Sequence, residues 1–159
     1  MGLSHNCQKD IAAIAAQAPN PGQISFAAIQ NALAYTTYYD GIGSQVSQSV
    51  LYPTSPQAGG LVANKTVGSL FNVPGTAVTA VTALGADFMF INAAYVSYSL
   101  STNEGLLMHE ALHELGLDDN AIGLGLELID PSIKPDTNNP NNWSNTKQFS
   151  DKFTKDCFN

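Results

Sequence analysis

The feature that most restricts the fold of this chain is a pair of histidines, His109 and His113, inside a segment with the pattern of a helix. Ser101 opens the segment and fits the start of a capping box, and good helix formers with a wide apolar face follow it. Gly116 stands where a left-handed, helix-terminating residue is expected. Four residues are close to one helical turn, so both imidazoles project from one face. The sequence therefore predicts a helix over about residues 102–115 that presents two imidazole rings together.

Two imidazoles one turn apart can bind one metal ion together, and Glu110 lies beside the first of them. In this H-E-x-x-H spacing the glutamate accepts a proton from water instead of binding the metal. Gly116 allows the backbone to reverse, which brings the following residues back towards the metal. Asp119 then supplies a third ligand and leaves a fourth position open, as in catalytic zinc sites. We therefore predict Zn²⁺ held by His109, His113 and Asp119, with Glu110 as general base.

Residues 109–119, read as H-E-x-x-H-x-x-G-x-x-D, resemble the signature of the metzincin zinc endopeptidases, whose snapalysin-like branch has aspartate in the last position. The resemblance implies a zincin-like α+β fold, in which the metal-binding helix packs against a small twisted sheet. It also implies the same three zinc ligands and the same general base, acting in peptide-bond hydrolysis. The chain departs from the family in one respect. Metzincins place a methionine in a turn after the third ligand, whereas the methionines here are Met1, Met89 and Met108.

Two other acidic residues compete for the third ligand position. Asp118 replaces Asp119 if the turn after the helix is one residue tighter. Glu127 is the candidate in a gluzincin-like arrangement, in which a glutamate from a following helix binds the metal. Tyr95 and Tyr98 precede the metal helix, and either could donate a hydrogen bond to a developing oxyanion, although aromatic residues at such positions also serve as core.

Two further acidic or polar features have simpler interpretations. Glu114 is expected to be a solvated residue of the helix predicted over residues 102–115. The Asn-rich segment 138–145 has no regular series of acidic ligands, so a surface loop is expected there and not a calcium site.

The sequence of the rest of the chain predicts a mixture of helices and short strands. The strongest strand is residues 87–92, apolar at its centre and bounded by polar residues. Short β-branched and aromatic runs between residues 44 and 87 are typical of strands and loops. Helices are expected over about residues 7–18, from Ser25 to about residue 40, after Asp118 or Asp119 to about residue 129, and over residues 146–156. With 159 residues and no linker or repeat, residues 1–159 are predicted to be one α+β domain.

The two cysteines, Cys7 and Cys157, stand near opposite ends of the chain. Chain ends often lie close together on a domain surface, which favours a disulfide between them over two free thiols. The bridge and the polar, weakly charged composition together indicate an oxidising compartment. We therefore expect an extracellular protein, although the first residues lack the basic and apolar regions of a signal peptide.

Charge and composition limit the partners. Six Lys and Arg against thirteen Asp and Glu give a formal charge of -7, with no basic cluster that could neutralise phosphates. Nucleic acid and anionic membranes are therefore excluded as expected partners. The predicted function is that of a monomeric zinc-dependent endopeptidase acting on peptides or proteins. Two alternatives stay open, namely a non-catalytic metal-binding interaction module and an effector or toxin domain excised from a larger secreted polypeptide.

Overall fold

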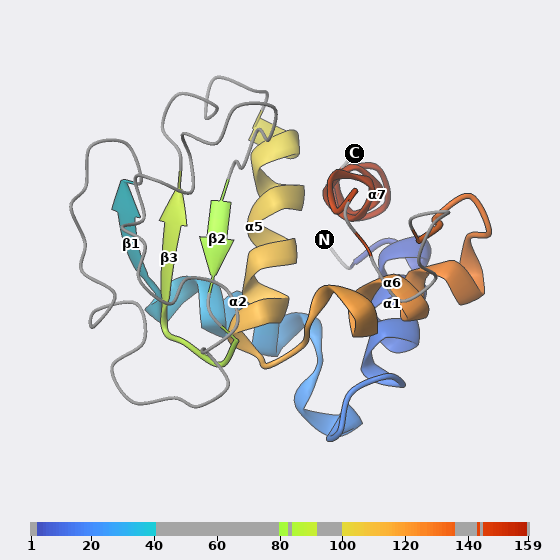
Figure 1. The fold of residues 1–159 in the computed structure, drawn as a ribbon, viewed down its shortest axis with the longest axis horizontal. Coiled ribbons are helices and arrows are strands. Elements are labelled where there is room, and N and C mark those ends of the chain that lie inside the picture. The colour runs from blue at the N-terminus through green and yellow to red at the C-terminus, as the bar shows by residue number, and fades with distance from the viewer. Residues whose placement is uncertain are drawn as a thin grey trace.

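The computed structural model describes residues 3–40, 80–82, 84–91, 100–135, 143 and 145–158. This part of the chain is mostly helical and includes a three-stranded sheet. The elements are α1 (His5–Ala15), the 3₁₀-helix η1 (Pro21–Gln23), α2 (Phe26–Tyr35), β1 (Thr37–Asp40), β2 (Ala80–Thr82), β3 (Phe88–Ile91), α5 (Leu100–Glu114), α6 (Asp119–Ile129) and α7 (Lys147–Cys157). Figure 1 shows α5 between the sheet and the group formed by α1, α6 and α7.

The sheet has β3 at its centre, with β1 parallel to it on one side and β2 antiparallel on the other. The strand predicted at residues 87–92 is therefore confirmed, and Met89 within it is fully buried. β2 is the strand that packs against α5. Gly85, in the turn between β2 and β3, has φ 71° and donates its backbone N–H to the carbonyl of His113 at 2.9 Å. This bond ties the sheet to the C-terminal end of α5.

The second helix is shorter than predicted. Ser25 caps its start as expected, accepting a hydrogen bond from the N–H of Ala28 at 3.1 Å. The helix ends at Tyr35 instead of near residue 40, and the next residues form β1. The N–H of Thr37 donates to the carbonyl of Asp87 at 2.8 Å as β1 joins β3. The β-branched and aromatic residues of β1 favour a strand once a partner strand is present.

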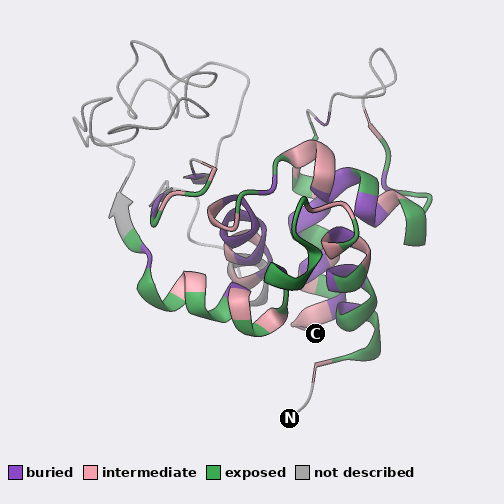
Figure 2. Ribbon diagram, turned by 90° about the horizontal axis from the view of Figure 1, so that it is seen from below, coloured by how far each residue is buried: buried purple, intermediate pink, exposed green. Residues whose placement is uncertain are grey.

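The core lies where α1, α5, α6 and α7 face one another, and the outer faces of α1, α6 and α7 are exposed (Figure 2). Small residues let these helices approach closely, since a Cβ on Gly125 of α6 would clash with the backbone of Ile14 in α1. The fully buried large side chains in this core include Phe149, Phe153, Ile14, Ile29, Met108, Leu112, Ile122 and Leu126. No helix within the described ranges is long and apolar enough to cross a membrane.

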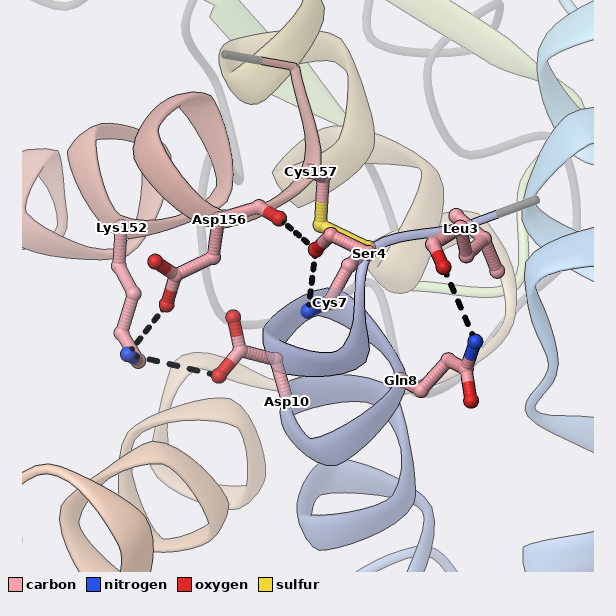
Figure 3. Close-up of a disulfide and its surroundings, with 8 residues drawn as sticks. All are labelled: Leu3, Ser4, Cys7, Gln8, Asp10, Lys152, Asp156 and Cys157. Carbon is pink, nitrogen blue, oxygen red and sulfur yellow. Dashed lines mark hydrogen bonds and ion pairs between the residues drawn. A yellow bond between two sulfur atoms is a disulfide. The ribbon is translucent and has the colours of Figure 1, made fainter. Parts of the chain in front are cut away.

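A disulfide joins Cys7 at the start of α1 to Cys157 at the end of α7, as predicted, with Cα atoms 4.8 Å apart. Figure 3 shows how Ser4 completes this junction. The hydroxyl of Ser4 accepts a hydrogen bond from the N–H of Cys7 at 3.0 Å and donates one to the carbonyl of Asp156. The bridge therefore fixes the far end of α7 to α1.

Candidate metal centre

The helix that carries both histidines is α5, which begins at Leu100. The helix therefore begins one residue before Ser101, which lies in its first turn and not at the predicted cap position. The difference is within the one or two residues by which a helix start varies with local fraying. The helical spacing of His109 and His113 is as predicted.

The end of α5 forms the reversal that the sequence predicts. Gly116 has φ 87°, and its N–H donates to the carbonyl of His113 at 2.9 Å. The N–H of Leu117 donates to the carbonyl of Leu112 at 3.0 Å. These two bonds form a Schellman motif, and Leu112 and Leu117 are both buried beside it. The chain then turns directly into α6, whose first residue is Asp119.

The turn places Asp119 against both histidines. Oδ1 of Asp119 lies 2.9 Å from Nε2 of His109 and 3.4 Å from Nε2 of His113. The two imidazole rings are 4.8 Å apart between centroids. Both histidines are buried, whereas 41% of the Asp119 side chain is exposed. The group therefore has a buried histidine side and a solvent-accessible carboxylate side.

These three residues could hold one metal ion. Each offers one ligand atom, and the three atoms lie within 4.8 Å of one another. Ligands about 2.1 Å from a tetrahedral zinc ion are about 3.4 Å apart, and the two distances from Oδ1 of Asp119 to the histidine Nε2 atoms, 2.9 Å and 3.4 Å, are close to this value. Two imidazole nitrogens and one carboxylate oxygen are a donor set that suits zinc.

The Nδ1 atoms of the two histidines have separate partners, which leave both Nε2 atoms directed to Asp119. Nδ1 of His113 lies 2.7 Å from the carbonyl oxygen of Leu117, which can only accept a hydrogen bond. Nδ1 of His109 lies 3.4 Å from the hydroxyl of Ser150 in α7. Such partners fix the orientation of metal-binding imidazoles.

The protein provides an apolar contact for the site without a methionine after the third ligand. Phe149 of α7 packs edge-on against His109, with ring centroids 5.5 Å apart. Trp143 also packs against Phe149, with ring centroids 5.6 Å apart. Met89 and Met108 are fully buried in the core. Sequence reasoning missed Phe149 and Ser150, because nothing in the local pattern of α7 relates it to residues about 40 positions earlier.

The charged forms of His113 and Asp119 stabilise each other. Burial alone would lower the pKa of His113, but its hydrogen bond to Asp119 and the charges of Glu110 and Asp119 raise that pKa to about 9. Burial would raise the pKa of Asp119, but its contacts with His109 and His113 hold it well below the ordinary value. A positive charge is therefore stabilised between these side chains, as either a proton or a metal cation.

Glu110 is buried next to this group. Its carboxylate oxygen Oε2 has no hydrogen-bond partner in the described part of the chain. Leaving a buried carboxylate oxygen unpaired costs free energy, and such groups call for a functional or ligand-based explanation. Within the described residues, Glu110 therefore keeps one carboxylate oxygen available to accept a hydrogen bond.

The structure separates the competing candidates. Asp118 is the N-cap of α6, and its carboxylate accepts a hydrogen bond from the N–H of Ala121 at 2.8 Å. The residue is exposed and is not part of the three-residue group. Glu127 lies near the end of α6 and is not part of the three-residue group. Tyr95 and Tyr98 lie outside the described residues, as does most of the segment 138–145.

The expectation that Glu114 is solvated is wrong. This residue is half-buried, and its Oε1 accepts a hydrogen bond from the hydroxyl of Thr36, between α2 and β1. Burial raises the pKa of the Glu114 carboxyl, and the bond from Thr36 opposes that shift. Glu114 therefore links the end of α5 to the segment leading into the sheet.

Comparisons of the chain with protein-family models, with curated proteins and with solved structures find no match. The likeness to zincin-type sites therefore rests on the motif at residues 109–119 and on the geometry of the His109, His113 and Asp119 group.

Proposed function

We propose that this chain is a zinc-dependent endopeptidase. His109, His113 and Asp119 would hold the ion with protein ligands, leaving a coordination position for water, as in catalytic zinc sites. Zinc, when bound there, would act as a Lewis acid that makes water a better nucleophile and polarises the scissile carbonyl.

The observation that carries the proposal is the buried carboxylate oxygen of Glu110 beside the three candidate ligands, which has no hydrogen-bond partner among the described residues. A structural metal site needs no such group. In peptide hydrolysis the attacking water gives a proton to Glu110 as its oxygen bonds to the carbonyl carbon. The same proton then passes from Glu110 to the departing amine as the C–N bond breaks.

Replacing Glu110 tests this role. Glu110→Gln keeps the shape of the side chain and all three ligands but cannot accept the proton. We expect the variant to retain zinc and to lose peptide cleavage by at least about 100-fold, the usual contribution of general-base catalysis. Glu104→Gln, on the same helix but outside the three-residue group, is the matched control and should cleave as the wild type does.

The main alternative is a non-catalytic metal-binding module. It predicts zinc binding without cleavage of any unstructured substrate, and no effect of Glu110→Gln beyond small changes in stability. Cleavage by Glu110→Gln at the wild-type rate would refute the general-base role.

The proposal extends to the setting of the enzyme. The Cys7–Cys157 disulfide is typical of oxidising compartments, which supports an extracellular location. The formal charge of -7 favours neutral or basic peptide substrates through long-range attraction, an effect that should weaken as salt is added. We propose a monomeric enzyme that acts on peptides or proteins and not on nucleic acid or membranes.

A further inference from the structure

The helix α7 packs along the face of α5 that carries His109, and this is the most extensive contact between described elements. Gly105 and His109 lie one turn apart on α5, and Ser150 and Thr154 lie one turn apart on α7. A Cβ atom on Gly105 would clash with the backbone carbonyl of Ser150 and with the side chain of Thr154. The glycine therefore allows the two backbones to approach closely one turn before His109.

This close approach brings the hydroxyl of Ser150 to His109. Ser150 is buried, with 7% of its surface exposed, and its Oγ lies 3.4 Å from Nδ1 of His109. The neighbouring Phe149 packs edge-on against the same ring. Two consecutive residues of α7 thus contact the imidazole, one with an apolar ring and one with a polar atom.

The chemistry of this contact differs from that at His113. The carbonyl of Leu117 can only accept, so Nδ1 of His113 carries a proton both with and without a metal. A hydroxyl can donate or accept. When Nε2 of His109 donates to Asp119 at 2.9 Å, the hydroxyl of Ser150 donates to Nδ1. When Nε2 gives its lone pair to a metal, Nδ1 carries the proton and donates to Ser150 instead.

We propose that Ser150 is a positioning residue, which holds the His109 imidazole in its metal-binding orientation through Nδ1. The hydroxyl serves both tautomers of the ring, so the ring keeps its orientation when a metal replaces the proton on Nε2. The inference rests on the metal-binding part of the proposed function and is independent of whether the protein cleaves peptides.

Zinc affinity tests the proposal. Removal of a group that supports a metal-binding histidine usually weakens metal binding by about 10- to 100-fold. Because the contact is long, we expect Ser150→Ala to weaken zinc binding by about tenfold, as measured by competition with a chromophoric chelator. Ser25→Ala is the matched control, because it removes the cap of α2 without touching the site. The control should bind zinc as the wild type does.

Imidazole ¹⁵N spectra separate a positioning role from a general loss of stability. In Ser150→Ala we expect the Nδ1 resonance of His109 to shift while that of His113 stays unchanged, in both metal-free and zinc-loaded protein. Wild-type zinc affinity in Ser150→Ala, or an unchanged Nδ1 resonance of His109, would overturn the proposal. A wild-type protein that binds no zinc would refute the proposed function, and the metal-free spectra would still decide whether Ser150 bonds to His109.

Discussion

Oδ1 of Asp119 lies 2.9 Å from Nε2 of His109, across the turn that joins α5 to α6. The two residues are ten positions apart, and the Schellman motif at Gly116 is what brings them together. The arrangement of the three candidate metal ligands therefore depends on the backbone of this turn as well as on the histidine spacing within α5.

Removing the Asp119 carboxylate should abolish the site. We expect Asp119→Ala to lose stoichiometric zinc and any cleavage together, because two imidazoles alone bind zinc weakly and the carboxylate also supplies charge. Asp119→His should retain part of both, since imidazole is an equally suitable zinc ligand. Metal analysis after dialysis against trace zinc checks both variants.

Asp118→Ala is the matched control for Asp119. It removes the N-cap of α6 and should lower the free energy of unfolding by about 1 kcal/mol, while zinc stays bound. Loss of zinc in Asp118→Ala with retention in Asp119→Ala would contradict the ligand assignment.

The turn itself can be tested at Gly116. At φ 87° any other residue is strained, so Gly116→Ala should lower the free energy of unfolding by about 1–2 kcal/mol and weaken zinc binding through displacement of Asp119. Gly22→Ala is the control, since Gly22 has neither a positive φ nor neighbouring atoms within 4 Å of an added Cβ. Urea unfolding with and without zinc measures both effects. Equal stability of Gly116→Ala and Gly22→Ala would contradict the requirement for a left-handed residue at this turn.

The disulfide should contribute strongly to stability. It closes a loop with a sequence separation of 150, for which chain entropy gives an upper value of about 5 kcal/mol. We expect the Cys7→Ala/Cys157→Ala double variant to unfold at much lower urea concentration than the wild type. Mass spectrometry of the unreduced protein should find it two hydrogens lighter than the dithiol, and two alkylatable thiols in the native protein would refute the bridge.

Asp10 should make stability depend on pH. Burial raises its pKa from 3.8 to about 7, with attraction by Lys152 opposing the shift and repulsion by Asp156 adding to it. Nζ of Lys152 lies 3.4 Å from Oδ1 of Asp10. The same ammonium group also forms ion pairs with Asp130 and Asp156. Between about pH 4 and pH 7 the folded state holds a proton that the unfolded state has released. The contribution of Asp10 to the free energy of unfolding therefore falls as pH rises through this interval.

Asp10→Asn removes that dependence. Relative to the wild type, we expect the variant to gain stability as pH rises from about 4 to 7, by at most about 1.4 kcal/mol per pH unit. The control is Asp151→Asn, whose exposed pair with Lys147 should change stability little and almost evenly with pH in this range. Parallel pH profiles of wild type and Asp10→Asn, from thermal or urea unfolding, would rule out a buried, protonated Asp10.

The sequence predicts the parts of the site that depend on local structure. The four-residue spacing of the histidines, the glycine at the end of α5 and the acidic start of α6 lie within eleven consecutive residues, and the structure brings them together. The disulfide was predictable because Cys7 and Cys157 are the only cysteines. The apolar centre of β3 likewise predicts a strand without knowledge of its neighbours, and its central place in the sheet comes from the structure.

The contacts made between distant segments were not predictable. The sequence of β1 predicts the end of a helix, and only its pairing with β3 makes it a strand. The hydrogen bond between Thr36 and Glu114 likewise depends on how distant segments pack. Ser150 and Phe149 reach His109 because of the close approach at Gly105, which no periodicity in α7 reveals.

The central claim is that His109, His113 and Asp119 bind one zinc ion that peptide cleavage requires. Metal analysis of the purified protein, combined with cleavage of an unfolded protein substrate before and after chelation, tests it most directly. We predict one zinc per chain, loss of cleavage with the chelator and recovery when zinc is added back. Cleavage that persists in the fully metal-free protein, or the absence of stoichiometric zinc from a protein supplied with it, would contradict the account.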